Sequence, residues 1–177
     1  MKHLTKLLAI VGLILQANFG FCQIQIRLRQ SFIDSLKNKV TIHVDYIIDK
    51  AHAHPNPASK DGDMHIAGRA ESVGLPIVAE IMNAASQTSA VNKVHAVEGS
   101  DETTDLTGVW RLWCEHAGND EQIQGETLTR FTTTNPAHVF EIHPITKINN
   151  NNLLTSLKPI NVGIDSHLCS LPSSRVV

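Results

Sequence analysis

The order of short apolar segments along the chain constrains its fold more than any other sequence feature. Residues 40–48 alternate apolar and polar side chains, which is typical of a strand with one buried face. Four further segments have strand-like apolar patterns, and one of them begins at Pro76, where a strand tolerates proline. These segments are 63–69, 76–82, 106–113 and 138–145. The chain is therefore predicted to be mainly β.

A single helix is predicted between the third and fourth strands. Residues 86–97 carry an apolar stripe behind N-cap residues such as Ser86, and Gly99 suits the end of a helix. Three strands, a helix and two strands is the order of the OB-fold, a five-stranded Greek-key barrel. Because five short strands must close around one core, we expect an OB-like barrel with the helix at an open end. An open five-stranded sheet with the helix packed across it is the alternative.

The start of the chain is predicted to be a secretory signal peptide. A basic start precedes an apolar segment, residues 7–15, that is too short to span a bilayer. Gly20 and Cys22 are the small residues expected before a cleavage at Gln23. The mature protein is therefore expected to be exported, either secreted or periplasmic. A lipid anchor on Cys22 is less favoured, because Phe21 is large where a lipoprotein signal has a small residue; an uncut membrane anchor is the remaining alternative.

The chain after this leader has the size of one ordinary domain. Its polar connection 115–136 is long for a compact domain and is either a mobile functional loop or an unrecognised hairpin. The expected division is a signal peptide (1–22), an N-terminal lead-in (23–39), the OB-like barrel (40–149) and a peripheral or poorly ordered tail (150–177).

Composition narrows the class of protein and the class of partner. Hydrophobic residues make up 42% of the chain and charged residues 18%, as in globular proteins. The net charge is −2, and loss of the basic leader makes it more negative, so strong nucleic-acid binding is not expected. No apolar segment after the leader has the length of a transmembrane span. A small ligand, an oligosaccharide or a protein are the partners that stay open.

Four short motifs resemble those of a family of small, uncharacterised exported bacterial proteins. They are GD-x-H at 62–65, AEI at 79–81, TG-x-W at 107–110 and EIHP at 141–144. The resemblance implies an OB-like fold and assigns no activity. Gly62 and Asp63 are also similar to a pair that opens a strand in staphylococcal-nuclease-like barrels. Those enzymes use a calcium-binding acidic set and two arginines, with which neither Arg69 nor Arg111 can be aligned, so no catalytic role is carried over.

Ionisable and aromatic side chains occupy the non-core positions of three predicted strands. Burying several charges in an apolar core is costly, so we expect these side chains to face away from it. This candidate polar face consists of Asp63, His65, Arg69, Arg111, Trp113, Glu141 and His143.

A divalent metal is the cofactor that this face suggests. Imidazole and carboxylate groups suit zinc and similar ions, and two residues apart on a strand they share a face. The metal-ligand candidates are His65, His116 and His143, with Asp63 or Glu141 beside them. The alternative is a set of surface histidines bonded to neighbouring carboxylates, because ten histidines produce such pairs by chance.

The sequence leaves the function open between two classes. A binding or structural module is favoured, in which Arg111 and Trp113 offer a stacking surface. A metal-dependent hydrolase of the nuclease-like kind is the alternative, and it requires Asp63, Glu80 and an arginine to meet in one cleft. No Ser–His–Asp arrangement is predicted. Cys114 lacks the positive surroundings of a nucleophile. Export makes a Cys114–Cys169 disulfide possible, but two unrelated thiols are favoured. Whether the protein is an enzyme stays open.

Overall fold

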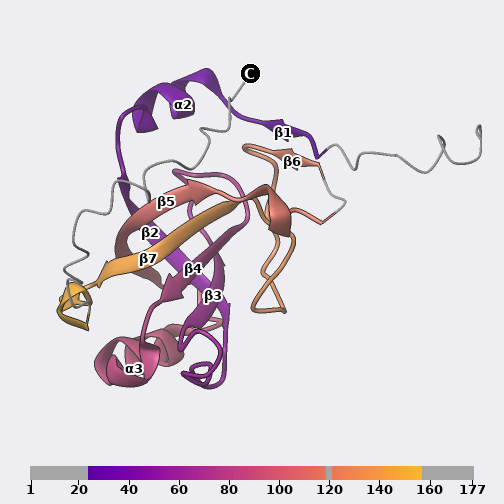
Figure 1. The fold of residues 1–177 in the computed structure, drawn as a ribbon. Coiled ribbons are helices and arrows are strands. Elements are labelled where there is room, and N and C mark those ends of the chain that lie inside the picture. The colour runs from indigo at the N-terminus through magenta and orange to yellow at the C-terminus, as the bar shows by residue number, and fades with distance from the viewer. Residues whose placement is uncertain (1–23, 119–120, 157–177) are drawn as a thin grey trace, which may run out of the picture.

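Five strands form a closed barrel in the computed structural model, which describes residues 24–118 and 121–156 (Figure 1). Their order is β4-β3-β2-β5-β7, and β4 pairs with β7 in parallel to close the barrel. All other neighbours in the barrel are antiparallel. This confirms the predicted OB-like Greek-key barrel and excludes the open sheet. The strands are β2 (Thr41–Ala51), β3 (Met64–Arg69), β4 (Ile77–Ile81), β5 (Thr103–Leu112) and β7 (Phe140–Ile148).

The helix that the sequence predicts between the third and fourth barrel strands is α3 (Thr88–Val97), preceded by the 3-10 turn η1 (Ala84–Ser86). Its buried face consists of Ala90, Val94 and Val97, and it lies at one end of the barrel (Figure 1). Among the residues described, no helix combines the length and the apolar content needed to cross a membrane.

The lead-in contains structure that the sequence does not predict. A short helix, α2 (Gln30–Leu36), lies at the end of the barrel opposite α3 (Figure 1). The preceding strand β1 (Ile26–Arg27) pairs in parallel with β6 (Gln122–Ile123), which belongs to the long β5–β7 connection. Elements of two and seven residues are too short to give a periodic signal. The β5–β7 connection also contains the 3-10 turn η2 (Cys114–His116).

The first residues of the predicted tail pack on the barrel. Strand β8 (Asn151–Asn152) adds to the edge of β7 outside the closed barrel, and Leu153 is 3% exposed and lies in the core. The 3-10 turn η3 (Leu154–Ser156) follows. The predicted signal peptide and the remainder of the tail lie outside the described residues.

The barrel core is built from alternate positions of its strands. Tyr46 is fully buried in it, and its hydroxyl lies 2.8 Å from the Ile66 carbonyl oxygen and 3.1 Å from that of Ile77. A core tyrosine of this kind satisfies its polar end on the backbone of two neighbouring strands. Gly108 lets β5 approach β7 closely, because a Cβ there would lie 2.4 Å from the Ile142 side chain.

The outward faces of four adjacent strands carry the polar residues of the candidate site. His65 on β3 stands opposite Glu80 on β4, and Arg111 on β5 stands opposite Glu141 on β7. All four lie outside the barrel core, which is the predicted position for His65, Arg111 and Glu141. Their position does not expose them to water, however, and Glu141 is 0% exposed. The β5–β7 connection packs against this part of the wall through His116.

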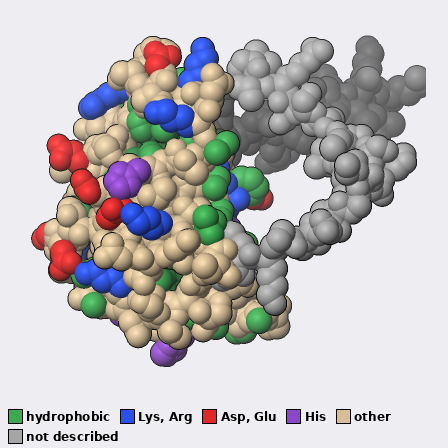
Figure 2. Space-filling model, turned by 90° about the vertical axis from the view of Figure 1, so that its left-hand side faces the viewer, with side chains coloured by type: hydrophobic (Ala, Val, Ile, Leu, Met, Phe, Trp, Pro, Cys, Tyr) green, Lys and Arg blue, Asp and Glu red, His purple; other side chains and the backbone are tan. Residues whose placement is uncertain are grey.

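The face of the molecule drawn in Figure 2 shows no basic stripe among the described residues. Acidic and basic side chains lie next to one another on this face, among small apolar groups. Such mixed charge is what a solvated surface normally has.

Candidate functional site

Two histidine rings converge on one carboxylate oxygen outside the barrel wall. His116 Nδ1 lies 3.0 Å from Glu141 Oε1, and His138 Nε2 lies 3.1 Å from the same oxygen. The donor atoms of the three residues all lie within 4.8 Å of one another. His138 and Glu141 are 0% exposed, whereas the side chain of His116 is 36% exposed. We call His116, His138 and Glu141 the triad.

Backbone pairing between the two ends of the β5–β7 connection holds the triad together. The His138 N–H donates to the His116 carbonyl oxygen over 3.0 Å, and the Trp113 N–H donates to the Val139 carbonyl oxygen over 2.7 Å. Glu141 follows on β7, on the face of that strand that points away from the core. Residues distant in the sequence are therefore positioned by a short ladder of main-chain bonds, which is more rigid than a free loop.

Arg111 binds the second oxygen of Glu141. Its Nε–H donates to Glu141 Oε2, and one terminal nitrogen, Nη2, lies 3.0 Å from His143 Nδ1. The guanidinium carbon lies 4.8 Å from the centre of the Trp113 ring, within the range of a cation–π contact. The pairing of β5 with β7 places Arg111 directly opposite Glu141, so strand register fixes this ion pair.

Asp63, Glu80 and His143 form a second group of acidic and imidazole side chains beside the triad. His143 Nδ1 lies 3.0 Å from Glu80 Oε2, and His143 Nε2 lies 3.8 Å from Asp63 Oδ2. Both carboxyl residues are only 5% exposed, and burial raises the pKa of Asp63. His65 Nε2 lies 3.7 Å from Glu80 Oε2, and its ring stacks on His52 with the ring centres 4.7 Å apart. We call Asp63, Glu80 and His143 the second group.

Hydrogen bonds in the site favour the charged forms of its principal groups. Burial acts to raise the pKa of Glu141, but hydrogen bonds from His138 and Arg111 outweigh it and lower that pKa to about 2. Burial also opposes ionisation of Glu80, yet its contact with His143 lowers the Glu80 pKa below the ordinary value. The same contact raises the pKa of His143. The site is therefore a network of charged pairs in which the carboxylates are buried, while Arg111 and His116 reach solvent.

Most of the predicted polar face is brought together in this network. Its members from that prediction are Asp63, His65, Arg111, Trp113, Glu141 and His143, joined by the metal-ligand candidate His116.

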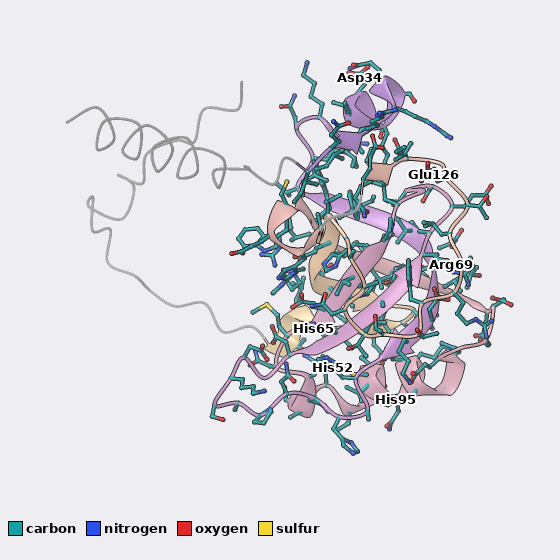
Figure 3. All side chains as sticks on the ribbon, turned by 90° about the vertical axis from the view of Figure 1, so that its right-hand side faces the viewer. Asp34, His52, His65, Arg69, His95 and Glu126 are labelled. Atoms are coloured by element: carbon teal, nitrogen blue, oxygen red, sulfur yellow. The ribbon has the colours of Figure 1, made fainter. Side chains whose placement is uncertain are left out.

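Arg69 does not join them. Its Nε lies 2.9 Å and its Nη2 2.8 Å from carboxylate oxygens of Asp49, and Nη2 also lies 3.3 Å from Asp101. Figure 3 shows Arg69 on a different part of the molecule from His52 and His65. Arg69 is four residues along β3 from His65, which is about 13 Å at 3.3 Å per residue, so a shared strand face does not bring it to the site.

Two members of the site receive little or no weight in the sequence analysis. His138 is assigned no ligand role there, although it stands three residues before Glu141. Glu80 is counted only among the groups available to a hydrolase. It is the lone charged residue of the apolar segment 76–82, and a charge in such a segment requires a buried partner. That partner is His143, which the sequence separation alone cannot indicate.

Comparison with known proteins gives no relative. No family model matches this chain, and no match is found among the curated proteins or the solved structures. The resemblance to small exported bacterial proteins stays an expectation, and the site is interpreted from its geometry.

Proposed function

We propose that this protein is an exported metal-binding module that holds one divalent metal ion, such as zinc, in the triad. The observation that carries the proposal is the convergence of His116 Nδ1 and His138 Nε2 on the single oxygen Glu141 Oε1. Two imidazoles and a carboxylate are a common ligand set for zinc.

The spacing of the three donors fits such an ion. Ligands at about 2.0–2.1 Å from a tetrahedral zinc lie about 3.3 Å from one another. The two nitrogen–oxygen separations in the triad are 3.0 and 3.1 Å, so small outward shifts would admit the ion. The exposed edge of His116 provides a path from solvent.

The hydrogen bonding of His138 supports the same interpretation. Its Nδ1 lies 2.8 Å from the Pro136 carbonyl oxygen, which can only accept a hydrogen bond, so Nδ1 carries a proton. In the neutral ring, Nε2 then presents a lone pair to Glu141 Oε1, and this contact is repulsive. Either a second proton on His138 or a metal ion makes it attractive. Metal-bound histidines commonly donate their other ring N–H to a backbone carbonyl in this way.

Titration with zinc tests the proposal. The full chain, stripped of metal by a chelator, is titrated against a chromophoric zinc indicator, and binding of one equivalent tighter than the indicator is expected. His116→Ala should abolish this tight binding, because it removes one of three ligands from the exposed side where the fold tolerates change. His43→Ala is the matched control, because His43 on β2 is exposed and lies beside Asp105 of β5.

Two results would overturn the proposal. One is a full chain that binds no zinc while its circular dichroism shows a folded protein. The other is a His116→Ala variant that binds zinc as tightly as the His43→Ala control.

A metal-dependent hydrolase is a second candidate function, and one observation favours it. Asp63, Glu80 and Arg111 are linked through their contacts with His143, beside the triad. A three-ligand site also leaves a coordination position for water or substrate, which catalytic metal sites keep and structural sites fill. Arg69 provides no support, since it lies in a separate ion pair with Asp49.

A further inference from the structure

We infer that Arg111 and the metal of the triad together bind a phosphate group, so that the ligand of this protein is a phosphate or a phosphate monoester. This inference rests on the proposed function, because it uses the metal as one of two anchors. It adds the chemical class of the molecule that the site recognises.

The first support is the unused donor capacity of Arg111. A guanidinium has five N–H donors; the Nε–H of Arg111 donates to Glu141, and Nη2 lies 3.0 Å from His143 Nδ1, which also faces the Glu80 carboxylate. Within residues 24–118 and 121–156 it has no other hydrogen-bond partner. Its side chain is 37% exposed, so the remaining N–H groups reach solvent. Arg111 is therefore held in place on one edge and open on the other.

The second support is the position of Arg111 relative to the triad. Glu141 directs one oxygen at the two histidines and the other at Arg111, so a metal in the triad and the guanidinium bind the same carboxylate. A ligand bound to a metal held by the triad would therefore lie within reach of the guanidinium. A planar guanidinium beside a metal ion is suited to an oxyanion, which can offer one oxygen to the metal and another to the guanidinium.

The third support is the charge around the site. The carboxylates of Asp63, Glu80 and Glu141 lie together there, and Arg111 is paired with one of them. These carboxylates repel an anion unless a divalent ion offsets them and also attracts it, and the low local dielectric strengthens that attraction. The metal-free site should therefore not bind the anion.

Trp113 offers a direct signal for such binding. Its indole is 39% exposed and lies against the Arg111 guanidinium. The other tryptophan, Trp110, stacks on Phe140 at a centroid distance of 5.8 Å and packs against the core. A change in tryptophan fluorescence on anion binding should therefore come from Trp113, and it should be lost in Trp113→Phe.

Phenyl phosphate is the probe for the experiment, titrated into the full chain with and without one equivalent of zinc. Binding is expected only with zinc, and Arg111→Lys should weaken it by about tenfold or more, because lysine keeps the charge and loses the planar fork. Arg130→Lys is the matched control, because Arg130 pairs with the exposed Asp101 away from the site. Zinc binding of each variant is measured in parallel.

A variant-free measurement accompanies this titration. Phenyl phosphate should tighten zinc binding to the unaltered chain by the same factor by which zinc tightens phenyl phosphate binding.

The possible failures are distinguishable. A chain that binds no zinc overturns the proposed function. A chain that binds zinc, with a zinc affinity that phenyl phosphate does not change, overturns the phosphate inference alone. Equal phenyl phosphate affinities of Arg111→Lys and Arg130→Lys would overturn the role assigned to Arg111.

Discussion

Asp49 is the residue whose replacement should most clearly destabilise the barrel without touching the triad. Its side chain is 0% exposed and receives three hydrogen bonds from Arg69, at 2.8, 2.9 and 3.2 Å. It also accepts a hydrogen bond from the Phe131 N–H over 3.2 Å. This one carboxylate therefore links β2, β3 and the β5–β7 connection. Asp49→Asn removes its charge and keeps its volume.

The expected loss follows from these contacts. Breaking a buried ion pair from one side costs about 3–5 kcal/mol. The actual loss should lie near the lower limit, because the Arg69 side chain is 21% exposed and keeps Asp101 as a partner. Asparagine can also still accept from Phe131. We expect Asp49→Asn to lower the free energy of unfolding by about 3 kcal/mol.

Urea unfolding followed by circular dichroism measures this loss. With a slope of about 1–3 kcal/mol per molar urea, the midpoint should fall by about 1–3 M. Asp34→Asn is the control, because Asp34 is exposed on α2 and its removal should change stability by less than about 0.5 kcal/mol. A loss below about 1 kcal/mol for Asp49→Asn would refute the reasoning, because an exposed ion pair can contribute up to that much to stability.

Three further predictions concern stability and processing. The pKa of Glu98 is lowered, because hydrogen bonds from Lys50 and the Ala51 N–H outweigh the effect of its burial. The unaltered chain should therefore be more stable than Glu98→Gln, with the full difference above pH 4.5 and a smaller one below it. An advantage that grew on acidification would contradict this. Gly108→Ala should lower the melting temperature, because the added Cβ would clash with β7. An unchanged melting temperature would contradict the close approach of β5 to β7. Protein recovered after export should begin at Gln23 by intact mass, and a lipid-modified Cys22 would contradict the predicted cleavage.

Much of the fold could be predicted from the sequence because each barrel strand has its own local pattern. Alternation over 40–48 corresponds to β2, and the apolar segment 76–82 contains β4, which is buried along its whole length. Helix α3, which lies between β4 and β5 in the sequence, has its own apolar stripe. What could not be predicted is α2 and the pairing of β1 with β6, since short elements are stabilised by tertiary contacts rather than by periodicity.

The site was harder to predict because burial outside the core has no local signature. Alternation correctly places Glu141 on the face of β7 that points away from the core. It does not reveal that His116 and His138 lie over that face, since this depends on how the long β5–β7 connection folds back. Arg69 shows the converse, because a residue on the same predicted face of β3 as His65 binds Asp49 instead.

Anomalous X-ray scattering at the zinc absorption edge, from crystals of the full chain grown with zinc, tests the metal site most directly. The account predicts one strong anomalous peak about 2.0–2.2 Å from His116 Nδ1, His138 Nε2 and Glu141 Oε1. A zinc-replete crystal whose triad shows the rings bonded directly to the carboxylate, with no peak among them, would contradict it.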